Sequence, residues 1–257
     1  MPAEFLESSL LRIAGFRHAF FGRRGGVSTG PYESLNVSIG VGDDPENVRR
    51  NLHLIAESLS VQAHRIFFLS QVHGATTSVL EGHETADVVR TREGDALSST
   101  SADLACCVRT ADCIPILAAD RRSGAVVAIH AGWRGIVRGV VEAGIASLRE
   151  LAQHPPEIVV AVGPHIRERA FEVSDDVAHE LEAASPVSGV VDRGRAKPHV
   201  SLARIVHGKL RALGVRHDAI DDVGGCTLTE ADRFFSFRRD GKISGRLLSA
   251  IVARGSD

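Results

Sequence analysis

The order of apolar and polar segments along the chain predicts short strands and amphipathic helices in loose succession. Two apolar segments, 114–119 and 125–129, are predicted to be buried strands, because both contain β-branched residues and both are bounded by turn residues. Residues 120–124, with Asp, Arg, Ser and Gly, predict the turn of a hairpin between them. An antiparallel pairing about this turn brings Cys113 and His130 to the same end of the sheet.

The rest of the chain follows the same kinds of pattern. A helix is predicted from Pro45 to about Leu59, because Asp44 is a good N-cap, Pro45 suits the first turn, and apolar residues recur at helical spacing. Other helices are expected at about 135–151, at 175–181 and after Ser201. Other strands are expected at 66–69, 76–80, 104–108, 157–162 and 219–223, with one or two in 10–21. The remaining segments include polar connections at 81–94 and 185–199 and a basic tail at 233–246.

These elements predict an α/β fold, a single domain with a mixed sheet, over residues 1–257. The length allows a substantial core, and 44% hydrophobic and 24% charged residues are ordinary for a globular protein. A net charge of −2 carries no signature of nucleic-acid or anionic-membrane binding, and no run approaches the ~20 apolar residues of a membrane span. The first residues lack the basic segment of a secretory signal, and the four cysteines do not form a disulfide framework. We therefore expect a cytoplasmic protein with reduced thiols, monomeric and without an obligate partner.

Candidate chemistry begins with the paired strand ends. A thiol and an imidazole at one sheet edge, Cys113 and His130, suit a metal site or a nucleophile with its base, and equally a buried cysteine beside a hydrogen-bonded histidine. The segment Gly132–Gly135 then opens a helix, and strand ends followed by glycine-flanked helix starts are common places for sites. His73, in Gln-Val-His-Gly, follows another strand end, and its importance depends on whether it meets the other two side chains.

Two arginine-containing segments are candidates for binding anions. Arg23 precedes the Gly25-Gly26 pair, whose backbone N–H groups are able to form an anion nest, with a plain glycine turn as the alternative. Arg246 closes the basic tail, for which a solvated surface is the alternative. Guanidinium groups bind phosphate through two parallel hydrogen bonds, which is why these arginines are considered.

Several linked motifs resemble one known family. They are Arg-Arg-Gly-Gly-Val-Ser at 23–28, Ser-Leu-Asn at 34–36, Gln-Val-His-Gly at 71–74, Ala-Asp-Cys-Ile-Pro at 111–115 and His-Ala-Gly-Trp-Arg-Gly at 130–135. Their order and combination resemble the YfiH-like family, also called the laccase-domain or polyphenol oxidoreductase family, over about residues 17–250. The last two motifs are highly specific, whereas the Gly-Gly turn alone is weak. Some relatives carry a cysteine cluster after the Gly-Pro turn, where this chain has His165, Ile166 and Arg169.

The resemblance implies sheets layered between helices and a zinc site formed by His73, Cys113 and His130. It also implies a purine nucleoside phosphorylase that acts on adenosine, inosine, guanosine and methylthioadenosine, with adenosine deaminase as a side activity. Arg23, Asn36 and Arg246 match the family pattern and are the expected substrate- and phosphate-binding residues. Purine nucleosides and inorganic phosphate are the expected partners.

The donor set helps to compare the possible reactions. Two nitrogens and one sulfur leave the fourth tetrahedral position of zinc open, which is typical of catalytic sites. Asp112, beside Cys113, is expected either to orient a ligand histidine or relay protons, or to be an ordinary surface carboxylate.

Three other interpretations remain. Copper-dependent polyphenol oxidation suits a His₂Cys set, but no two of the 12 histidines are separated by a single residue, as paired ligands of an oxygen-reducing cluster would be. A cysteine hydrolase with Cys113 and His130 leaves His73 without a role. A zinc-stabilised binding module needs a fourth protein ligand, for which Cys226 is the candidate.

Overall fold

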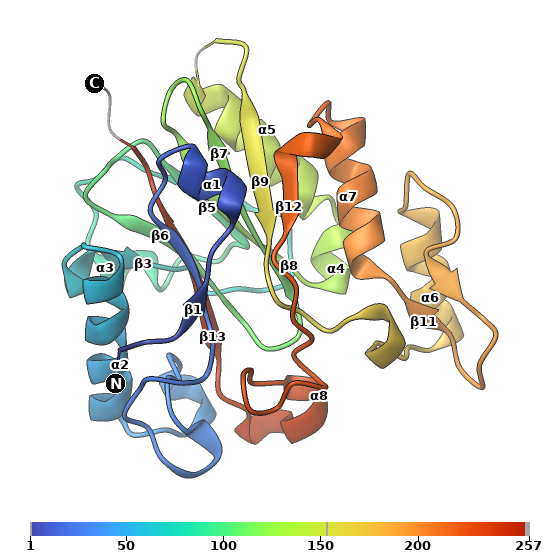
Figure 1. The fold of residues 1–257 in the computed structure, drawn as a ribbon, viewed down its shortest axis with the longest axis horizontal. Helices are drawn as coiled ribbons and strands as arrows, with labels where there is room; N and C mark the ends of the chain where they lie inside the picture. Colours follow the sequence, from blue (N-terminus) through green and yellow to red (C-terminus); the bar gives the residue numbers. More distant parts are fainter. Residues whose placement is uncertain (1, 153, 255–257) are drawn as a thin grey trace.

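Two β-sheets lie face to face at the centre of the molecule, as Figure 1 shows for the computed structural model, which describes residues 2–152 and 154–254. The five-stranded sheet has the order β1 (Phe5–Leu6), β2 (His18–Phe21), β13 (Leu247–Val252), β6 (Ala105–Thr110) and β3 (Ile66–Phe67). The six-stranded sheet has the order β12 (Ile220–Asp222), β9 (Ile158–Val162), β7 (Ile114–Asp120), β8 (Val126–Ala131), β5 (Ala96–Ser99) and β4 (Thr77–Leu80). Both sheets are mixed, because β3 pairs parallel with β6, β4 with β5, and β12 with β9, while their other pairs are antiparallel.

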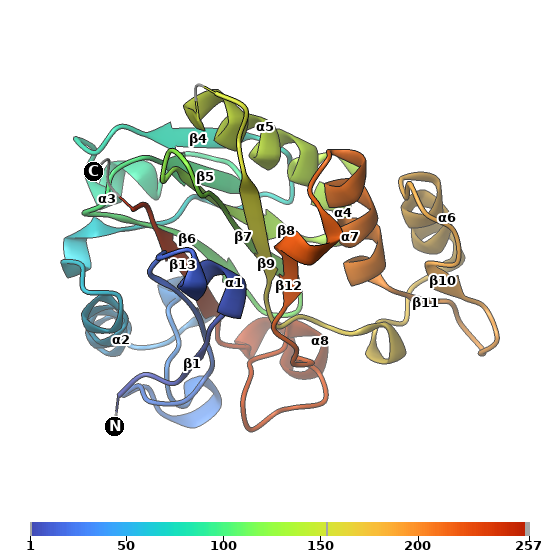
Figure 2. The same cartoon turned by 45° about the horizontal axis from the view of Figure 1, so that its top comes forward.

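Helices cover the outer faces of both sheets, so the fold has four layers (Figures 1 and 2). Helix α2 (Pro45–Ser58) packs on the five-stranded sheet, and α5 (Val140–Ala152) and α7 (Leu202–Ala212) pack on the six-stranded sheet. The shorter helices are α1 (Ser9–Ile13), α3 (Ala86–Val89), α4 (Trp133–Val137), α6 (Asp175–Ala183) and α8 (Phe237–Asp240). A small hairpin of β10 (Val191–Asp192) and β11 (His199–Val200) lies beside α6.

The alternation of side chains along β7 explains how this strand packs against two different layers. Ile114 and Ile116 face α5 and α7, while Leu117 and Ala119 face the five-stranded sheet. Because successive side chains point to opposite faces, a strand buried on both sides is apolar throughout. This is the continuous apolar pattern that predicted β7 and β8 from the sequence.

The predicted mixed α/β architecture is confirmed, and so are the 114–120 and 126–131 hairpin and the helix capped by Asp44, whose side chain accepts from the N–H of Glu46. Of the one or two strands expected in 10–21, one is present as β2, while residues 9–13 form α1. The helix expected over about 135–151 is instead two helices, because Gly139 adopts a left-handed φ of 87° that ends α4. The tail contains α8 and leads into β13, an interior strand that the sequence analysis did not identify.

None of the described helices combines the length and the apolar character that a membrane span requires.

Candidate metal centre

The β7–β8 hairpin positions two of the three candidate ligands. Pro115 lies opposite His130 in the ladder, and Ile114 lies opposite Ala131, so Cys113, which directly precedes β7, is near His130 at the same end of the sheet. The predicted proximity of the thiol and the imidazole is therefore present in the structure.

Asp95 brings the third candidate ligand to the hairpin. It precedes β5, the other neighbour of β8, and its carboxylate accepts hydrogen bonds from the backbone N–H groups of Val72 (3.3 Å), His73 (3.0 Å) and Gly74 (2.7 Å). The same carboxylate lies 2.7 Å from Nδ1 of His130. An ionised carboxylate only accepts, so Nδ1 carries the hydrogen that Asp95 accepts, and Nε2 is the His130 nitrogen that a metal would bind.

The three candidate ligand atoms form a compact cluster. One donor atom each from His73, Cys113 and His130 lie within 4.8 Å of one another, and Sγ of Cys113 is 3.7 Å from Nε2 of His73. A β-carbon on Gly132 would approach Cδ2 of His73 to 2.6 Å and Sγ of Cys113 to 3.0 Å. The glycine therefore leaves the space in which the two side chains converge. Two imidazole nitrogens and one thiol sulfur in this space fit a tetrahedral zinc or a copper ion.

The charges in the cluster favour a thiolate. Burial raises the pKa of the Cys113 thiol, but the charge of His130 and the hydrogen bonds from His130 and His73 outweigh burial and lower this pKa to about 6. Burial lowers the pKa of His130, while the Cys113 thiolate and Asp95 raise it to about 9. The thiolate is the metal-binding form of cysteine, so the cluster is prepared for a cation.

Two residues beside the cluster have unusual backbone conformations. His73 has φ of 56° and Asp112 has φ of 99°, both in the left-handed region that residues other than glycine seldom adopt. Such conformations gather at functional sites, where the surrounding structure enforces them. Here the hydrogen bonds that the Asp95 carboxylate accepts hold the His73 turn, while the Asp112 carboxylate accepts from Thr227 Oγ1 and from the N–H of Arg238, both at 2.6 Å.

The cluster opens into a cavity of about 580 Å³. The aromatic side chains of Trp133, Phe171 and Phe237 line it, and the guanidinium groups of Arg134, Arg238 and Arg246 lie over these rings. Arg109 and Arg246 line it as well, and both are at the same end of the β6–β13 ladder. A cavity of this size that combines apolar rings with convergent polar and charged groups is typical of small-molecule sites.

The predicted site residues differ in how they relate to this cavity. Asp112 and Arg246 line it, but Asp112 uses its carboxylate to anchor the C-terminal segment, and Asp95 orients the histidine instead. Arg23 lies outside the cavity lining; its guanidinium binds the carbonyl oxygens of Glu33 (2.7 Å) and Ala231 (2.9 Å). Asn36 is fully buried, and its Oδ1 accepts from the N–H of Arg246 (2.9 Å).

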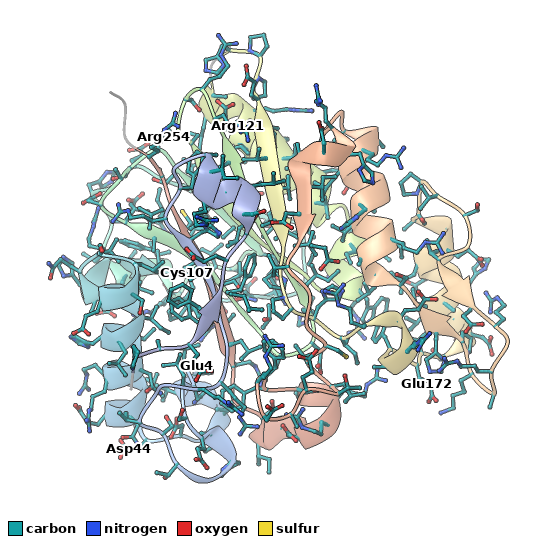
Figure 3. The ribbon with its side chains drawn as sticks, viewed as in Figure 1. Glu4, Asp44, Cys107, Arg121, Glu172 and Arg254 are labelled. Carbon is teal, nitrogen blue, oxygen red and sulfur yellow. The ribbon has the colours of Figure 1, made fainter. Side chains whose placement is uncertain are left out.

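The other cysteines are separate from the cluster. Cys106 and Cys107 are in the core, where burial raises the pKa of both thiols; Figure 3 labels Cys107 between α2 and the sheets. Cys226 pairs through a backbone bridge with His165 and is not part of the metal-binding group found among the described residues. The expected fourth ligand of a closed structural site is therefore not Cys226 in this conformation.

Comparison with known proteins identifies the relationship. A model of the family described as multi-copper polyphenol oxidoreductase laccase matches residues 17–254. The chain belongs to this family. A relative named purine nucleoside phosphorylase from Streptomyces coelicolor is 39% identical over 238 residues, which cover 91% of this chain and 94% of the relative. Purine nucleoside phosphorylase YfiH of Escherichia coli is 35% identical over 231 residues, covering 89% and 90%.

Solved structures show the same fold. The crystal structure of YlmD from Geobacillus stearothermophilus has a TM-score of 0.87 and 29% identity, covering 98% of this chain and 100% of that one. The YfiH protein of Bacillus licheniformis has a TM-score of 0.89 at 24% identity, covering 99% and 97%. The likeness to the second structure concerns the fold alone.

Proposed function

We propose that this protein is a zinc-dependent purine nucleoside phosphorylase whose active site is the His73–Cys113–His130 centre and its cavity. The observation that carries the proposal is the position of an incomplete N, N, S ligand set at the wall of a cavity lined by aromatic rings and arginines. The names of the relatives, purine nucleoside phosphorylase, agree with this reaction.

The reaction requires three functions from the site. In phosphorolysis an oxygen of inorganic phosphate forms a bond to ribose C1′, the bond from C1′ to the purine nitrogen breaks, and its electron pair moves to the purine. The products are ribose 1-phosphate and the free base. The site must hold phosphate, hold the purine, and stabilise the negative charge that develops on the leaving base.

The residues of the cavity suit these functions. Trp133, Phe171 and Phe237 offer flat apolar surfaces on which a purine ring packs, and Arg246 offers a guanidinium to the phosphate. Zinc held by His73, Cys113 and His130 would supply a Lewis acid for the developing charge. Asp95 keeps His130 in the tautomer that presents Nε2 to this position.

The same centre accounts for the broader substrate range implied by the family. Adenosine, inosine, guanosine and methylthioadenosine share the glycosidic bond to a purine, and aromatic rings in the cavity lining offer apolar packing that does not depend on the substituents of the purine. Deamination of adenosine, which we propose as a side activity, replaces the amino group by oxygen from water and needs a metal-activated water.

Copper-dependent polyphenol oxidation is the second candidate, because the family description names this chemistry and the His₂Cys set is suited to copper. Over the described ranges, however, only this one group of three metal-binding side chains is found, while oxygen reduction by a multicopper enzyme needs further copper ligands. A cysteine hydrolase using Cys113 and His130 is a third possibility and gives His73 no role.

A pair of cysteine substitutions tests the assignment. Cys113→Ser is expected to lose both bound metal and nucleoside turnover, because a neutral hydroxyl replaces the thiolate ligand. Cys226→Ser is the matched control and is expected to keep both, since Cys226 lies outside the cluster. Metal content by elemental analysis and base release from inosine are the two readouts. Nucleoside turnover by a metal-free Cys113→Ser protein would refute the metal-centre mechanism.

A further inference from the structure

Arg109 and Arg246 are neighbours on one face of the five-stranded sheet. In the β6–β13 ladder Arg109 lies opposite Leu248, and Arg246 is two residues before Leu248. Residues in this diagonal relation point to the same face, with Cα atoms roughly 7–8 Å apart. Both line the cavity that contains the candidate metal ligands.

Neither arginine takes part in an ion pair within the described ranges. Burial lowers the pKa of Arg246, and the negative charges of Cys113 and Asp112, which line the same cavity, act against this shift. The guanidinium of Arg109 stacks 4.3 Å from the ring centroid of Phe68 and has a long 3.5 Å contact with the carbonyl of Leu69. Burial, and then the positive charges of Arg246 and Arg90, lower the pKa of Arg109 to about 10. Among the described residues, the Arg246 guanidinium donates to the carbonyl oxygens of Ser244 (2.7 Å) and Gly245 (3.1 Å) and lies 5.7 Å from the centroid of the Phe237 ring. An anion between the two guanidiniums would relieve their mutual repulsion.

Hydrogen bonds fix the backbone of each arginine. The Gln71 side chain donates to the carbonyl of Arg109 and accepts from its N–H, both at 2.8 Å. Gln71 is two residues from His73, so one short segment positions both a candidate metal ligand and Arg109. On the other strand, Oδ1 of Asn36 accepts from the N–H of Arg246, and the N–H of Val37 donates to the Arg246 carbonyl (3.3 Å).

We propose that Arg109 and Arg246 together form the phosphate subsite of this cavity, with Arg109 taking the place that the sequence assigned to Arg23. This inference rests on the proposed phosphorylase function and names the residue that gives the site its preference for a phosphate group. Two guanidinium forks are able to hold a phosphate dianion through paired, charge-assisted hydrogen bonds. The same chemistry would also hold a phosphate ester of the nucleoside, and we assign the subsite to free inorganic phosphate.

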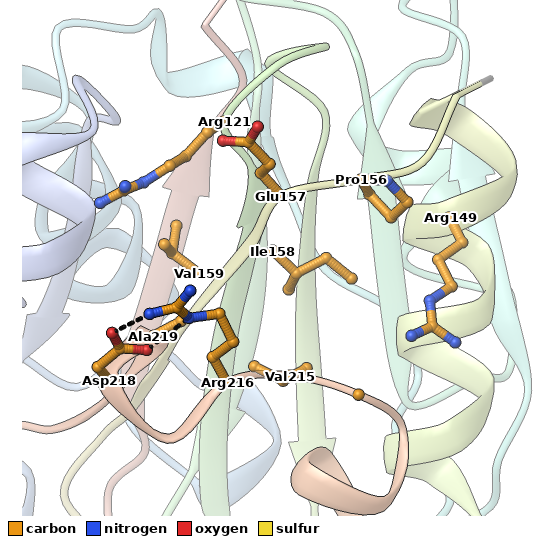
Figure 4. Close-up of a pocket in the computed structure, with 11 residues that line it drawn as sticks. Arg121, Arg149, Pro156, Glu157, Ile158, Val159, Val215, Arg216, Asp218 and Ala219 are labelled. Carbon is orange, nitrogen blue, oxygen red and sulfur yellow. Dashed lines mark hydrogen bonds and ion pairs between the residues drawn. The ribbon is translucent and has the colours of Figure 1, made fainter.

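A second arginine-lined cavity, of about 590 Å³, differs from this one (Figure 4). Its Arg216 is paired with Asp218 at 2.9 and 2.5 Å, and Arg149 donates to the carbonyl of Leu213. It lies at the opposite end of β7, since Cys113 precedes the first residue of this strand and Arg121 follows the last. Arg121, an exposed member of this cavity, is a suitable control for the removal of one positive charge.

The test compares Arg109→Met, Arg246→Met and the control Arg121→Met. In the phosphorolysis assay, the first two are expected to raise the phosphate KM at least about tenfold, since each removes charged hydrogen bonds, while the inosine KM changes much less. Arg109→Lys keeps the charge but not the fork and should lie between wild type and Arg109→Met. Arg121→Met should match wild type in both constants. Retained metal content shows that each variant is folded.

Direct titration with inorganic phosphate separates this inference from the proposed function. Calorimetry on the metal-loaded wild type, without nucleoside, should show phosphate binding that Arg109→Met weakens at least about tenfold, whether or not the protein cleaves nucleosides. Phosphate affinity and phosphate KM that are unchanged in Arg109→Met would overturn the subsite. A variant that loses affinity for inosine 5′-monophosphate while its phosphate KM stays at the wild-type value would overturn the assignment to free phosphate.

Discussion

Asp95 connects two of the three candidate metal ligands through a single buried carboxylate. It receives the N–H groups of the His73 turn and the Nδ1–H of His130, so the positions of both imidazoles depend on it. Burial raises the pKa of Asp95, but these hydrogen bonds outweigh it and leave the pKa below its usual value, so the carboxylate is ionised at neutral pH. Orienting partners of this kind commonly have a large effect on metal affinity.

Replacing the Asp95 carboxylate by an amide tests its effect on the metal ligands. Asp95→Asn should lower zinc affinity by about 10–100-fold, because the amide no longer accepts from both the turn and the histidine with a full negative charge. Competition with a chelator measures the affinity. Asp120→Asn makes the same change at another buried aspartate, at the far end of β7, and should leave zinc affinity unaltered. Equal loss of affinity in the two variants would show a general folding effect instead.

Gly132 has a φ of −72°, which any residue can adopt. Gly132→Ala is therefore expected to act through space alone, by placing a methyl group against His73 and Cys113 and reducing metal content and turnover together. Gly40→Ala, where the nearest atom to an added β-carbon would be Ser38 Oγ at 3.9 Å, is the control. Full metal loading of Gly132→Ala would contradict the placement of the ligands.

Some of the candidate site residues could be predicted from the sequence and others could not, for a physical reason. Cys113 and His130 followed from one local hairpin, and His73 was a candidate from its place at another strand end, with its role as a ligand implied by the family resemblance. Asp95 and Arg109 act through contacts with segments far away in sequence, for example Asp95 with His130, 35 residues later. These contacts are not contained in any local pattern. Two weaker signals were present in the sequence: Asp95 directly precedes a buried strand, and Gln71, which binds the Arg109 backbone, is two residues from His73.

At the scale of elements, apolar patterns were reliable where a strand is buried on both faces. Segments β7 and β8 are continuous apolar runs and were predicted. The similar run Leu247–Val252 was not recognised, although it forms β13 between β2 and β6. Its neighbours come from residues near 20 and near 108, so its place in the sheet depends on pairing that a local pattern does not contain.

Hydrogen bonds to the Asp120 carboxylate hold the turn between β7 and β8. The Asp120 carboxylate accepts from the N–H (2.8 Å) and hydroxyl (2.7 Å) of Ser123 and from the N–H of Glu157 (2.6 Å). Burial raises the pKa of Asp120, but these hydrogen bonds lower it by more, so the pKa in the folded protein is below the usual value. The ionised form is thus the stabilising one, and its contribution is lost as the pH falls below about 4.

Asp120→Asn should therefore destabilise the protein by about 1–3 kcal/mol at pH 7, and by less at pH 3, which lies below the ordinary pKa of an aspartate, so that the contribution of the ionised carboxyl has begun to fall. Urea unfolding at the two pH values measures the free energies. The account of this turn would be contradicted by a difference between wild type and variant that is the same at both pH values.

At the scale of the whole molecule, the site is where segments from distant parts of the chain meet. The cavity is lined by residues from the 70–73, 109–113 and 130–134 segments and by Phe237, Arg238 and Arg246 of the C-terminal segment. The four-layer packing brings these together at one end of the sheets, and family members with the same fold share this architecture. The resemblance implied that the sheets are layered between helices. That Arg109 lines the cavity together with Arg246 was learned only from the structure.

The most direct measurement is inosine cleavage by protein of known metal content, with and without inorganic phosphate. With about one zinc per chain, we expect hypoxanthine release only when phosphate is present, together with an equal amount of ribose 1-phosphate. Hypoxanthine release that does not depend on phosphate would contradict the phosphorylase proposal. The absence of release, with phenol oxidation that rises with copper loading, would contradict it in favour of the oxidase.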